Sequence, residues 1–450
     1  MTLHLEIVCD LFYMDIETRF YHRRSLLQKR IGNGAAIIPS SVETKKSRDQ
    51  RHHFRQDSNF FYLTGFSEPN SALLLLGGKR GPRSVIFLRE RDPLKERYEG
   101  EHLGLTRAKR RFKIDEVRNI ENLENDLTGL LKDHATLHYV PAVNPEVDSV
   151  VWRIFCRQSD PSSRFPYQLK DLRAELHQMR AVKDSYEINC IKRAIEITID
   201  AFVKLASDLP SLKSEAHAAK LLEQYFTEFG ASSLGFDTIV ASGKNATTLH
   251  HSPLLSPILK QKLVLIDAGA EFNGYSADIS RTFPVSGKFS TAEKEIYNLV
   301  LAALETAQKR VHPQATANSI HLAAVKEITK GLIDLKIIKD KDWQTAFTGE
   351  KYKPYFMHRT SHFLGLDVHD PPPPQLDGSI THSEPLRLQP GHVITVEPGL
   401  YFDSRDMSIP RHFRGIGIRL ENDVLVTPHG GSVLTSRLPV TLSDVEELLK

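Results

Sequence analysis

The chain has 450 residues, of which 40% are hydrophobic and 26% charged, and its formal net charge is +3 at pH 7. This composition is that of a globular protein without a membrane span, and the near balance of charge gives no electrostatic reason to expect a nucleic-acid partner. The three cysteines are widely spaced and form no CxxC pair. This excludes a disulfide framework and fits a reducing compartment.

The N-terminal stretch, residues 1–13, is mildly apolar but contains Glu6 and Asp10 and no Arg. It therefore lacks the charge pattern of a secretory signal or a mitochondrial presequence. Met14 precedes a helical pattern over residues 15–30, so residues 1–13 are expected to be either untranslated or disordered. We predict a cytoplasmic location, with a mitochondrial one as the alternative.

Strand and helix patterns mix through the first third of the chain, whose total length exceeds one ordinary core. Strand-like runs cover 35–39, 59–66, 71–76 and 84–88, and helical patterns cover 123–131 and 148–157. A basic cluster over 107–113 fits a solvated helical face. We predict a smaller α/β domain over 1–170, followed by a linker over 171–182.

The second domain, predicted over 183–450, combines amphipathic helices with strands and is assigned to the α+β class. Asp184 with Glu187, and Ser290 with Glu293, form capping boxes that open two of its helices. Further helices are predicted over 214–229 and 317–335, and strands or loops over 236–241, 263–284, 358–370, 393–402 and 416–426.

The stretch 263–284 is predicted to be a β-hairpin, because its Asn-Gly dipeptide at 273–274 favours a type I′ turn. In that register Gly269 faces Asp278, and Asp267 is the diagonal neighbour of Asp278 on the same face, with Cβ atoms roughly 7–8 Å apart. Two carboxylates that converge from a half-buried hairpin repel each other unless a cation lies between them. A metal site is therefore one hypothesis, and two solvated aspartates at strand ends are the alternative.

Three further patches place polar residues where strand periodicity predicts core. Glu397 ends a β-branched run immediately before Pro398 and Gly399. Arg419 and Glu421 are two residues apart and hence share one face of an apolar strand. The third patch contains His358, His362, Asp367, His369 and Asp370. Taken singly, these patches have ordinary interpretations: a surface Glu, a salt bridge on an edge strand and hydrogen-bonded structural histidines.

Taken together, the patches supply four carboxylates with one or more histidines. The carboxylates are those of Asp267, Asp278, Glu397 and Glu421. Their charge is about what two divalent cations neutralise, and an oxygen-rich set with an imidazole suits Mn²⁺, Co²⁺ or Zn²⁺. Two ions roughly 3.5–4 Å apart would activate a water molecule and polarise a carbonyl group. The set therefore indicates metal-assisted hydrolysis of an amide or an ester.

Four motifs in order, DAG…GY..DISRTFPVSGKFS, TSHFLGLDVHD, TVEPGLY and GIRLENDVLV, resemble those of metallopeptidases with the pita-bread (creatinase/aminopeptidase) fold. Within that group the chain is similar to the aminopeptidase P family, the Xaa-Pro aminopeptidases, because SNFFYLTGFSEP and FLRERDPLKERYEG match its N-terminal domain. The resemblance covers nearly the whole chain from about Asp15. It implies release of the N-terminal residue from peptides with proline in second position, and a homo-oligomer, either a dimer or a tetramer.

The family pattern also implies a centre of two divalent metal ions, with Mn²⁺ as the first choice. It makes Asp267 a ligand of one metal, Asp278 and Glu421 bridging ligands, and His362 and Glu397 ligands of the second metal. In this pattern Glu397 is also the general base for the attacking water.

The same resemblance implies roles for residues around the metals. His250 matches the histidine near the scissile carbonyl, and His369 matches the one that contacts the substrate and the tetrahedral intermediate. His358 and Arg419 match positions behind the ligands, with Arg419 placed to orient Glu421.

The chain departs from the family pattern at a few positions. His251 follows His250 where the family often has Tyr, Ser280 stands where Thr is usual, and prolines follow Asp370. We expect these changes to touch the rim of the pocket more than the metals, and hence to affect substrate preference. The alternatives are a prolidase, which shares the fold and metals but cleaves only dipeptides, and a catalytically silent pita-bread binding module; methionine aminopeptidase lacks a first domain of this kind.

Overall fold

The computed structural model describes residues 16–78, 81–156, 166–260, 262–373 and 386–450. The chain forms two compact units, Met1–Arg180 and Ala181–Lys450. The expectations for residues 1–13 and Met14 fall outside the described residues. The range 171–182, expected as a linker, contains helix α8 (Arg173–Ala181). Within the described ranges, the helices are too short or too polar to cross a membrane.

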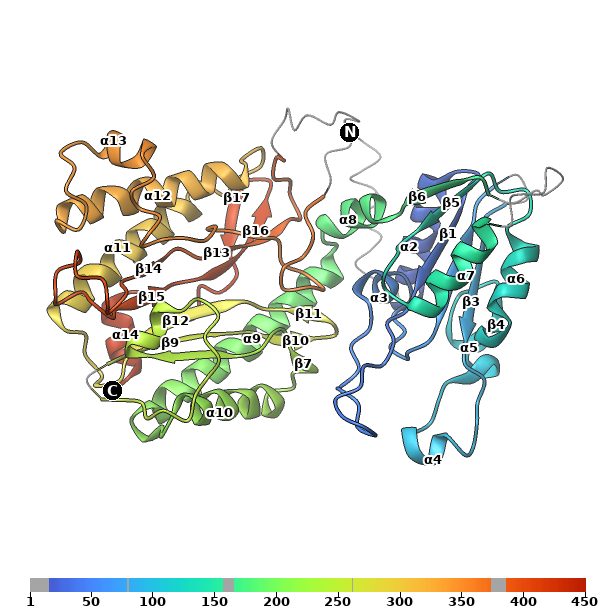
Figure 1. The fold of residues 1–450 in the computed structure, drawn as a ribbon, viewed down its shortest axis with the longest axis horizontal. Helices are drawn as coiled ribbons and strands as arrows, with labels where there is room; N and C mark the ends of the chain where they lie inside the picture. Colours follow the sequence, from blue (N-terminus) through green and yellow to red (C-terminus); the bar gives the residue numbers. More distant parts are fainter. Residues whose placement is uncertain (1–15, 79–80, 157–165, 261, 374–385) are drawn as a thin grey trace. The chain divides into compact units, whose positions relative to one another are not determined.

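A mixed six-stranded sheet with the order β4-β3-β2-β1-β5-β6 forms the centre of the first unit (Figure 1). Its strands are β1 (Ala35–Pro39), β2 (Ala72–Leu76), β3 (Arg83–Leu88), β4 (Glu116–Asn119), β5 (Thr136–Tyr139) and β6 (Gln168–Asp171). Besides α8, the helices of the first unit are α2 (Ile16–Ile31), α3 (Ser58–Thr64), α4 (Glu96–Glu99), α5 (Gly104–Arg111), α6 (Leu123–Leu130) and α7 (Pro145–Cys156). The β1-β2 and β2-β3 pairs are antiparallel, whereas the three other pairs are parallel. The predicted mixture of strands and helices is confirmed.

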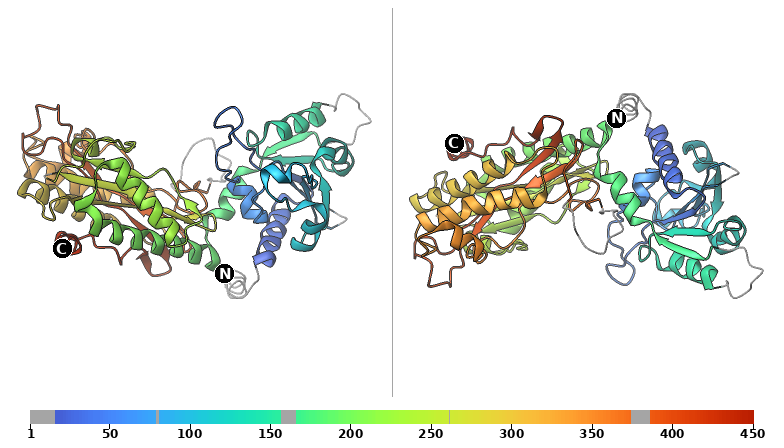
Figure 2. Two further views of the ribbon diagram at one scale, coloured as in Figure 1. Left: turned by 90° about the horizontal axis from the view of Figure 1, so that it is seen from below. Right: turned by 90° about the horizontal axis from the view of Figure 1, so that it is seen from above.

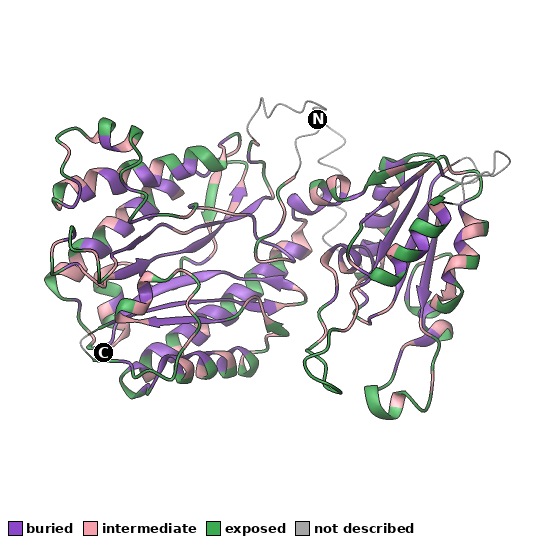
Figure 3. Cartoon of the chain, in the orientation of Figure 1, coloured by how far each residue is buried: buried purple, intermediate pink, exposed green. Residues whose placement is uncertain are grey.

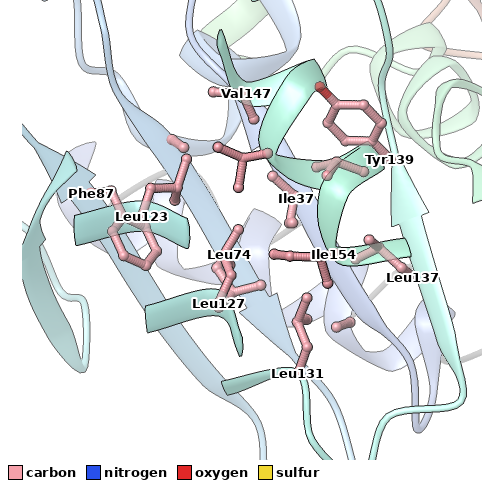
Figure 4. Packing of buried hydrophobic residues seen from close by; sticks show 14 of the residues in the cluster. Ile37, Leu74, Phe87, Leu123, Leu127, Leu131, Leu137, Tyr139, Val147 and Ile154 are labelled. Atoms are coloured by element: carbon pink, nitrogen blue, oxygen red, sulfur yellow. The ribbon is translucent and has the colours of Figure 1, made fainter. Parts of the chain in front are cut away.

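Helices α6 and α7 pack on one face of this sheet and form a hydrophobic core with it (Figure 4). Alternate strand residues, among them Ile37, Leu74 and Phe87, point into the core, because successive side chains of a strand lie on opposite faces. Leu127 of α6 and Ile154 of α7 pack against them. The first unit therefore has a core of its own.

The run 59–66, which we predicted to be strand-like, contains most of helix α3, so that prediction is wrong. The Asp57 side chain accepts a hydrogen bond from the Phe60 N–H in the first turn, and Gly65 ends the helix in the left-handed conformation. These two end signals outweigh the strand preference of the aromatic residues between them.

The second unit consists of small sheets covered by helices on two sides. Its strands are β7 (Ser233–Leu234), β8 (Ile239–Ser242), β9 (Leu263–Ala268), β10 (Ala270–Phe272), β11 (Tyr275–Ser276), β12 (Ile279–Pro284), β13 (Val393–Val396), β14 (Gly399–Tyr401), β15 (Gly417–Arg419), β16 (Asn422–Thr427) and β17 (Gly430–Val433). Its helices are α9 (Ser185–Asp208), α10 (Glu215–Glu228), the 3-10 helix η5 (Gly243–Thr247), α11 (Thr291–Gln308), α12 (Ala317–Asp334), α13 (Trp343–Thr348) and α14 (Leu442–Leu448). Helices α9 and α10 lie on one side of the strands, and α11 and α12 lie on the other (Figures 1 and 2). This is the predicted α+β, pita-bread arrangement.

Both predicted capping boxes are present, that of Asp184 with Glu187 at α9 and that of Ser290 with Glu293 at α11. Strands β9 and β12 contact β15 in the middle of the unit, and β12 also contacts β16. These central strands are almost wholly buried, whereas the outer faces of the helices are exposed (Figure 3). Polar side chains on the central strands are therefore held in a protected interior.

Candidate metal centre

The hairpin of β9 to β12 has the register that the sequence predicts. Asn273 and Gly274 in its turn have φ values of 50° and 84°, the left-handed conformation that a type I′ turn requires. Asp267 pairs with Ser280 in the β9-β12 ladder. Because Asp278 lies two residues before Ser280, the Asp267 and Asp278 side chains are diagonal neighbours on one face.

The ladder is interrupted at Gly269, between β9 and β10. A Cβ atom at Gly269 would lie 1.7 Å from the Ala277 carbonyl oxygen, so only glycine permits this close approach of the two backbones. On the other strand, the Asp278 N–H donates to Oδ2 of Asp423 at 3.1 Å. The interruption thus lies between the two aspartates and fixes the backbone that presents them.

Two neighbouring segments bring His362 and Glu397 together. Glu397 follows β13, and its N–H donates to the Thr360 carbonyl at 2.8 Å. The Thr395 N–H donates to the His362 carbonyl at 2.9 Å. The segment that carries His362 therefore lies alongside β13, so the imidazole and the Glu397 carboxylate enter the site from adjacent positions.

Four of the five expected ligands converge. One ligand atom each of Asp278, His362 and Glu421 lies within 4.8 Å of the other two. The His362 Nε2 atom is 3.4 Å from Asp278 Oδ2 and 3.6 Å from Glu397 Oε1. The fifth residue, Asp267, lies on the same face of the hairpin as Asp278.

Burial and mutual repulsion disfavour the charged carboxylates when no cation is bound. Burial first, and then the neighbouring carboxylates, raise the pKa values of Asp278 and Glu421 well above their usual range. Burial also raises the pKa of Glu397 to about 7. Oδ1 of Asp267 is buried and accepts no hydrogen bond from the described residues. A divalent cation would relieve both the repulsion and the unmet acceptor, so these residues fit a metal centre.

Arg419 and Ser280 connect the carboxylates from behind. Arg419 Nη2 donates to Asp267 Oδ2 at 2.6 Å, and its Nε donates to Ser280 Oγ at 2.9 Å. Ser280 Oγ in turn donates to Glu421 Oε2 at 2.8 Å. Arg419 thus holds Asp267 directly and reaches Glu421 through the Ser280 hydroxyl, whereas the resemblance implied that Arg419 orients Glu421.

The expectation that Ser280 lies at the rim of the pocket is wrong. Ser280 is 0% exposed and lies between Arg419 and Glu421. The sequence contained a signal for this position, because the hairpin register places Ser280 opposite Asp267. A residue opposite a candidate ligand on a buried strand is expected beneath the site.

His358 lies against the carboxylate of Glu397. Its Nδ1 atom is 3.5 Å from Glu397 Oε2, and its Nε2 atom is 2.8 Å from the Tyr401 hydroxyl. Burial, followed by the positive charge of Arg419, lowers the pKa of His358 to about 3. The imidazole is therefore neutral at physiological pH and can orient its neighbours without adding charge.

His369 and His250 lie on the more open side of the site, and both are exposed. The ring centroid of His369 is 4.1 Å from that of His362. Burial, then His362 and then His250 lower the pKa of His369. His250 also contributes to the low pKa of His358, which places His250 near both histidines.

Sequence reasoning missed two ionisable residues beneath the centre. Asp423 is fully buried, and burial raises its pKa to about 8. Arg281 is also buried, and its Nη1 donates to the carbonyl oxygens of Ser280 and Glu421 at 3.0 and 2.6 Å. Asp423 could have been found, because it is two residues from Glu421 and hence on the same face of the strand. No sequence pattern points to the contacts of Arg281, because they join distant segments.

A buried ion pair holds the segment that carries His362 and His369. Lys183 Nζ lies 2.9 Å from Asp370 Oδ2, and both side chains are 1% exposed. Asp370 forms a β-bridge with Phe363, which closes the loop between the two histidines. The pair therefore ties this loop to the residues that precede α9.

Known proteins share both units of the chain. Residues 189–428 match the model of metallopeptidase family M24, and residues 20–139 match that of the aminopeptidase P N-terminal domain. The Xaa-Pro aminopeptidase of Haemophilus influenzae is 37% identical over 417 residues, which cover 93% of either chain. Human Xaa-Pro aminopeptidase 3 is 30% identical over 98% of this chain and 87% of its own length.

Solved structures of aminopeptidases are also similar to this chain over nearly its whole length. Zinc-substituted aminopeptidase P of E. coli in complex with product has a TM-score of 0.91 at 33% sequence identity, over 97% of this chain and 98% of that chain. Aminopeptidase PepP of Pseudomonas aeruginosa has a TM-score of 0.89, also at 33% identity. These likenesses show that the chain belongs to metallopeptidase family M24, among the Xaa-Pro aminopeptidases, and that it is a metal-dependent hydrolase.

Proposed function

We propose that this enzyme releases the N-terminal residue from peptides with proline in second position, and that the acidic centre of the second unit performs the hydrolysis. The observation that carries the assignment of the site is the convergence of Asp278, His362 and Glu421, whose ligand atoms lie within 4.8 Å of one another. The Xaa-Pro aminopeptidases that match almost the whole chain support the choice of substrate. An amide that precedes proline has no N–H, and its φ is constrained, so it needs a dedicated peptidase.

The proposed ligands of two divalent cations are Asp267, Asp278, His362, Glu397 and Glu421. Bound cations of this kind supply activation of a water molecule and polarisation of the scissile carbonyl. Four carboxylates and one imidazole favour Mn²⁺, with Co²⁺ or Zn²⁺ as alternatives.

Glu397 is the proposed general base. Its Oε1 atom lies 3.6 Å from His362 Nε2, so the carboxylate stands within the centre where the attacking water would be activated. It accepts a proton from the attacking water and later returns it to the leaving proline nitrogen. His358 is proposed to border this carboxylate: its Nδ1 atom lies 3.5 Å from Glu397 Oε2 and 2.8 Å from the Arg359 carbonyl oxygen.

The exposed histidines are proposed to act on the substrate. His250 donates a hydrogen bond near the scissile carbonyl, where negative charge develops in the transition state. His369 contacts the substrate and the tetrahedral intermediate. Arg419 acts behind the ligands, where it holds Asp267.

Three further proposals concern the whole protein. The chain forms a homo-oligomer, a dimer or a tetramer, and works in the cytoplasm, with mitochondria as the alternative. Its domain boundaries are proposed at 1–170 and 183–450. Sedimentation of the purified protein and fractionation of cells test the first two proposals.

Hydrolysis of Arg-Pro-Pro and of Arg-Pro by EDTA-treated enzyme, before and after addition of Mn²⁺, tests the function. We expect release of Arg from the tripeptide only with metal. Cleavage of the dipeptide alone would identify a prolidase, and cleavage of neither peptide by metal-loaded protein would favour a silent binding module.

Glu397→Ala tests the proposed general base. We expect kcat to fall by about 10²–10⁴-fold, because the variant lacks both the proton acceptor and one proposed metal ligand, while the melting temperature stays near that of the wild type. Glu295→Ala, an exposed position on α11, is the control and retains activity. Activity near the wild-type level in Glu397→Ala would refute the role.

A further inference from the structure

A buried carboxylate outside the metal centre accepts hydrogen bonds from both ends of the segment 242–254, which contains His250. Glu215 is the first residue of α10 and is 0% exposed. Its Oε1 accepts hydrogen bonds from the Ser242 N–H at 2.7 Å and from the Asn245 side-chain amide at 2.9 Å. The carboxylate thus contacts the start of the segment.

The other oxygen of Glu215 contacts the end of the same segment. Its Oε2 accepts hydrogen bonds from His251 Nε2 at 2.9 Å and from the Leu254 N–H at 3.1 Å. An ionised carboxylate is an acceptor only, so the Nε2 atom of His251 must carry the proton. One side chain therefore ties together both ends of the segment.

The four donors account for the burial of this charge. An ionised carboxylate offers about four acceptor positions, and Glu215 uses them all on partners within the protein. Its place in the first turn of a helix also favours a negative charge. Loss of a donor would leave a buried charge partly unsatisfied, which is costly. The geometry of the segment and the charge of Glu215 consequently depend on each other.

His250 lies between two fixed points of the segment. On one side, Leu249 packs against a hydrophobic cluster that includes Leu265 of β9 and Tyr401 of β14. On the other side, His251 is bonded to Glu215. His250 itself is exposed. The backbone on both sides of His250 is therefore held while its side chain is free to meet a ligand.

We propose that Glu215 and His251 are positioning residues that act on hydrolysis through His250. The proposal rests on the role of His250 near the scissile carbonyl. It also gives a role to His251, which stands where the family often has tyrosine: His251 holds the segment 242–254 in place through Glu215 and does not select the substrate.

The first test compares three variants of the metal-loaded, full-length enzyme. We expect His251→Ala to lower kcat for Arg-Pro-Pro by about 10–100-fold, since a small displacement of a catalytic group has effects of this size, with a smaller change in KM. His251→Gln, whose amide can also donate to Glu215, should recover most of the loss. The control is His217→Ala, which replaces an exposed histidine on α10, the helix that begins with Glu215. Its kcat should match that of the wild type. Metal content should be unchanged throughout, because the segment holds none of the proposed ligands.

The second test repeats His251→Ala in a His250→Ala background. If His251 acts through His250, the added loss there should be less than about twofold, and Glu215→Gln should behave in the same way. Equal losses in both backgrounds, or full activity of His251→Ala, would overturn the positioning role alone. Full activity of His250→Ala would overturn both this inference and the proposed role of His250.

Discussion

At the scale of single residues, the hydroxyl of Ser280 is the link between the cationic and anionic parts of the centre. It accepts from Arg419 and donates to Glu421. Residues that hydrogen-bond to ligands typically change metal affinity by 10–100-fold when removed. Ser280 is therefore expected to matter for metal binding, although it is not a ligand itself.

Ser280→Ala removes this hydroxyl and leaves the buried Arg419 Nε without its acceptor. We expect the dissociation constant for Mn²⁺ to rise by about 10–100-fold, measured by titration of the EDTA-treated protein. Ser280→Thr keeps the hydroxyl and is the matched control, which should bind as tightly as the wild type. A Ser280→Ala variant with unchanged affinity would contradict the proposed link.

At the scale of secondary-structure elements, the hairpin depends on the close approach at Gly269. Gly269→Ala would place Cβ 1.7 Å from the Ala277 carbonyl oxygen, so the strands must separate. We expect a loss of about 3 kcal/mol in the free energy of unfolding, together with weaker Mn²⁺ binding, because Asp267 and Asp278 flank the displaced backbone.

Gly129→Ala is the control for that substitution. Gly129 lies in α6, and a Cβ atom there would meet no atom within 4 Å. Alanine in a helix is more stable than glycine by about 0.5–1 kcal/mol, so this variant should be slightly stabilised and bind Mn²⁺ normally. If Gly269→Ala behaves like Gly129→Ala, the close approach does not shape the centre. Urea unfolding and metal titration measure both quantities.

At the scale of the whole molecule, buried groups make stability depend on pH. Burial, followed by the charge of Lys183, lowers the pKa of His392 to about 4. Between pH 4 and the unfolded value of about 6.5, the unfolded chain therefore binds a proton that the folded chain does not. The contribution of His392 thus destabilises the fold as pH falls through this window.

The prediction compares the wild type with His392→Gln, a neutral replacement, in EDTA. From pH 7 to pH 5 the free energy of unfolding of the wild type should fall by about 2 kcal/mol more than that of the variant, because each unit of pKa shift corresponds to about 1.4 kcal/mol. Urea unfolding at the two pH values measures this difference. Parallel pH profiles of the two proteins would show that His392 does not titrate in this way.

The pH dependence of the wild-type free energy of unfolding would not isolate His392, because the carboxylates of the metal centre change that free energy in the opposite direction. The pKa of Glu397 is raised to about 7, so the folded chain keeps a proton that the unfolded chain loses above about pH 4.5. This contribution weakens the metal-free fold as pH rises from about 4.5 to 7. The comparison with His392→Gln cancels it, since both proteins contain the same carboxylates.

Much of the second unit could be predicted from local patterns. The Asn273 and Gly274 turn determines the hairpin register, and two capping boxes mark the helix starts. The prediction failed for α3, where strand-like aromatic residues lie between a helix cap at Asp57 and a left-handed Gly65. Propensity is a weak signal there, because the end signals and burial of the aromatic side chains decide the conformation.

The sequence by itself determined the hairpin register, the position of Glu397 at a strand end and the pairing of Arg419 and Glu421 on one face, since these follow from the period of a strand and the demands of a turn. Only the tertiary structure decided which atoms meet. In it, Arg419 donates a hydrogen bond to Asp267, and the Ser280 hydroxyl donates one to Glu421. The reason is that such contacts join segments far apart in the chain, and the packing of strands and helices, which no local period encodes, sets the distances between them.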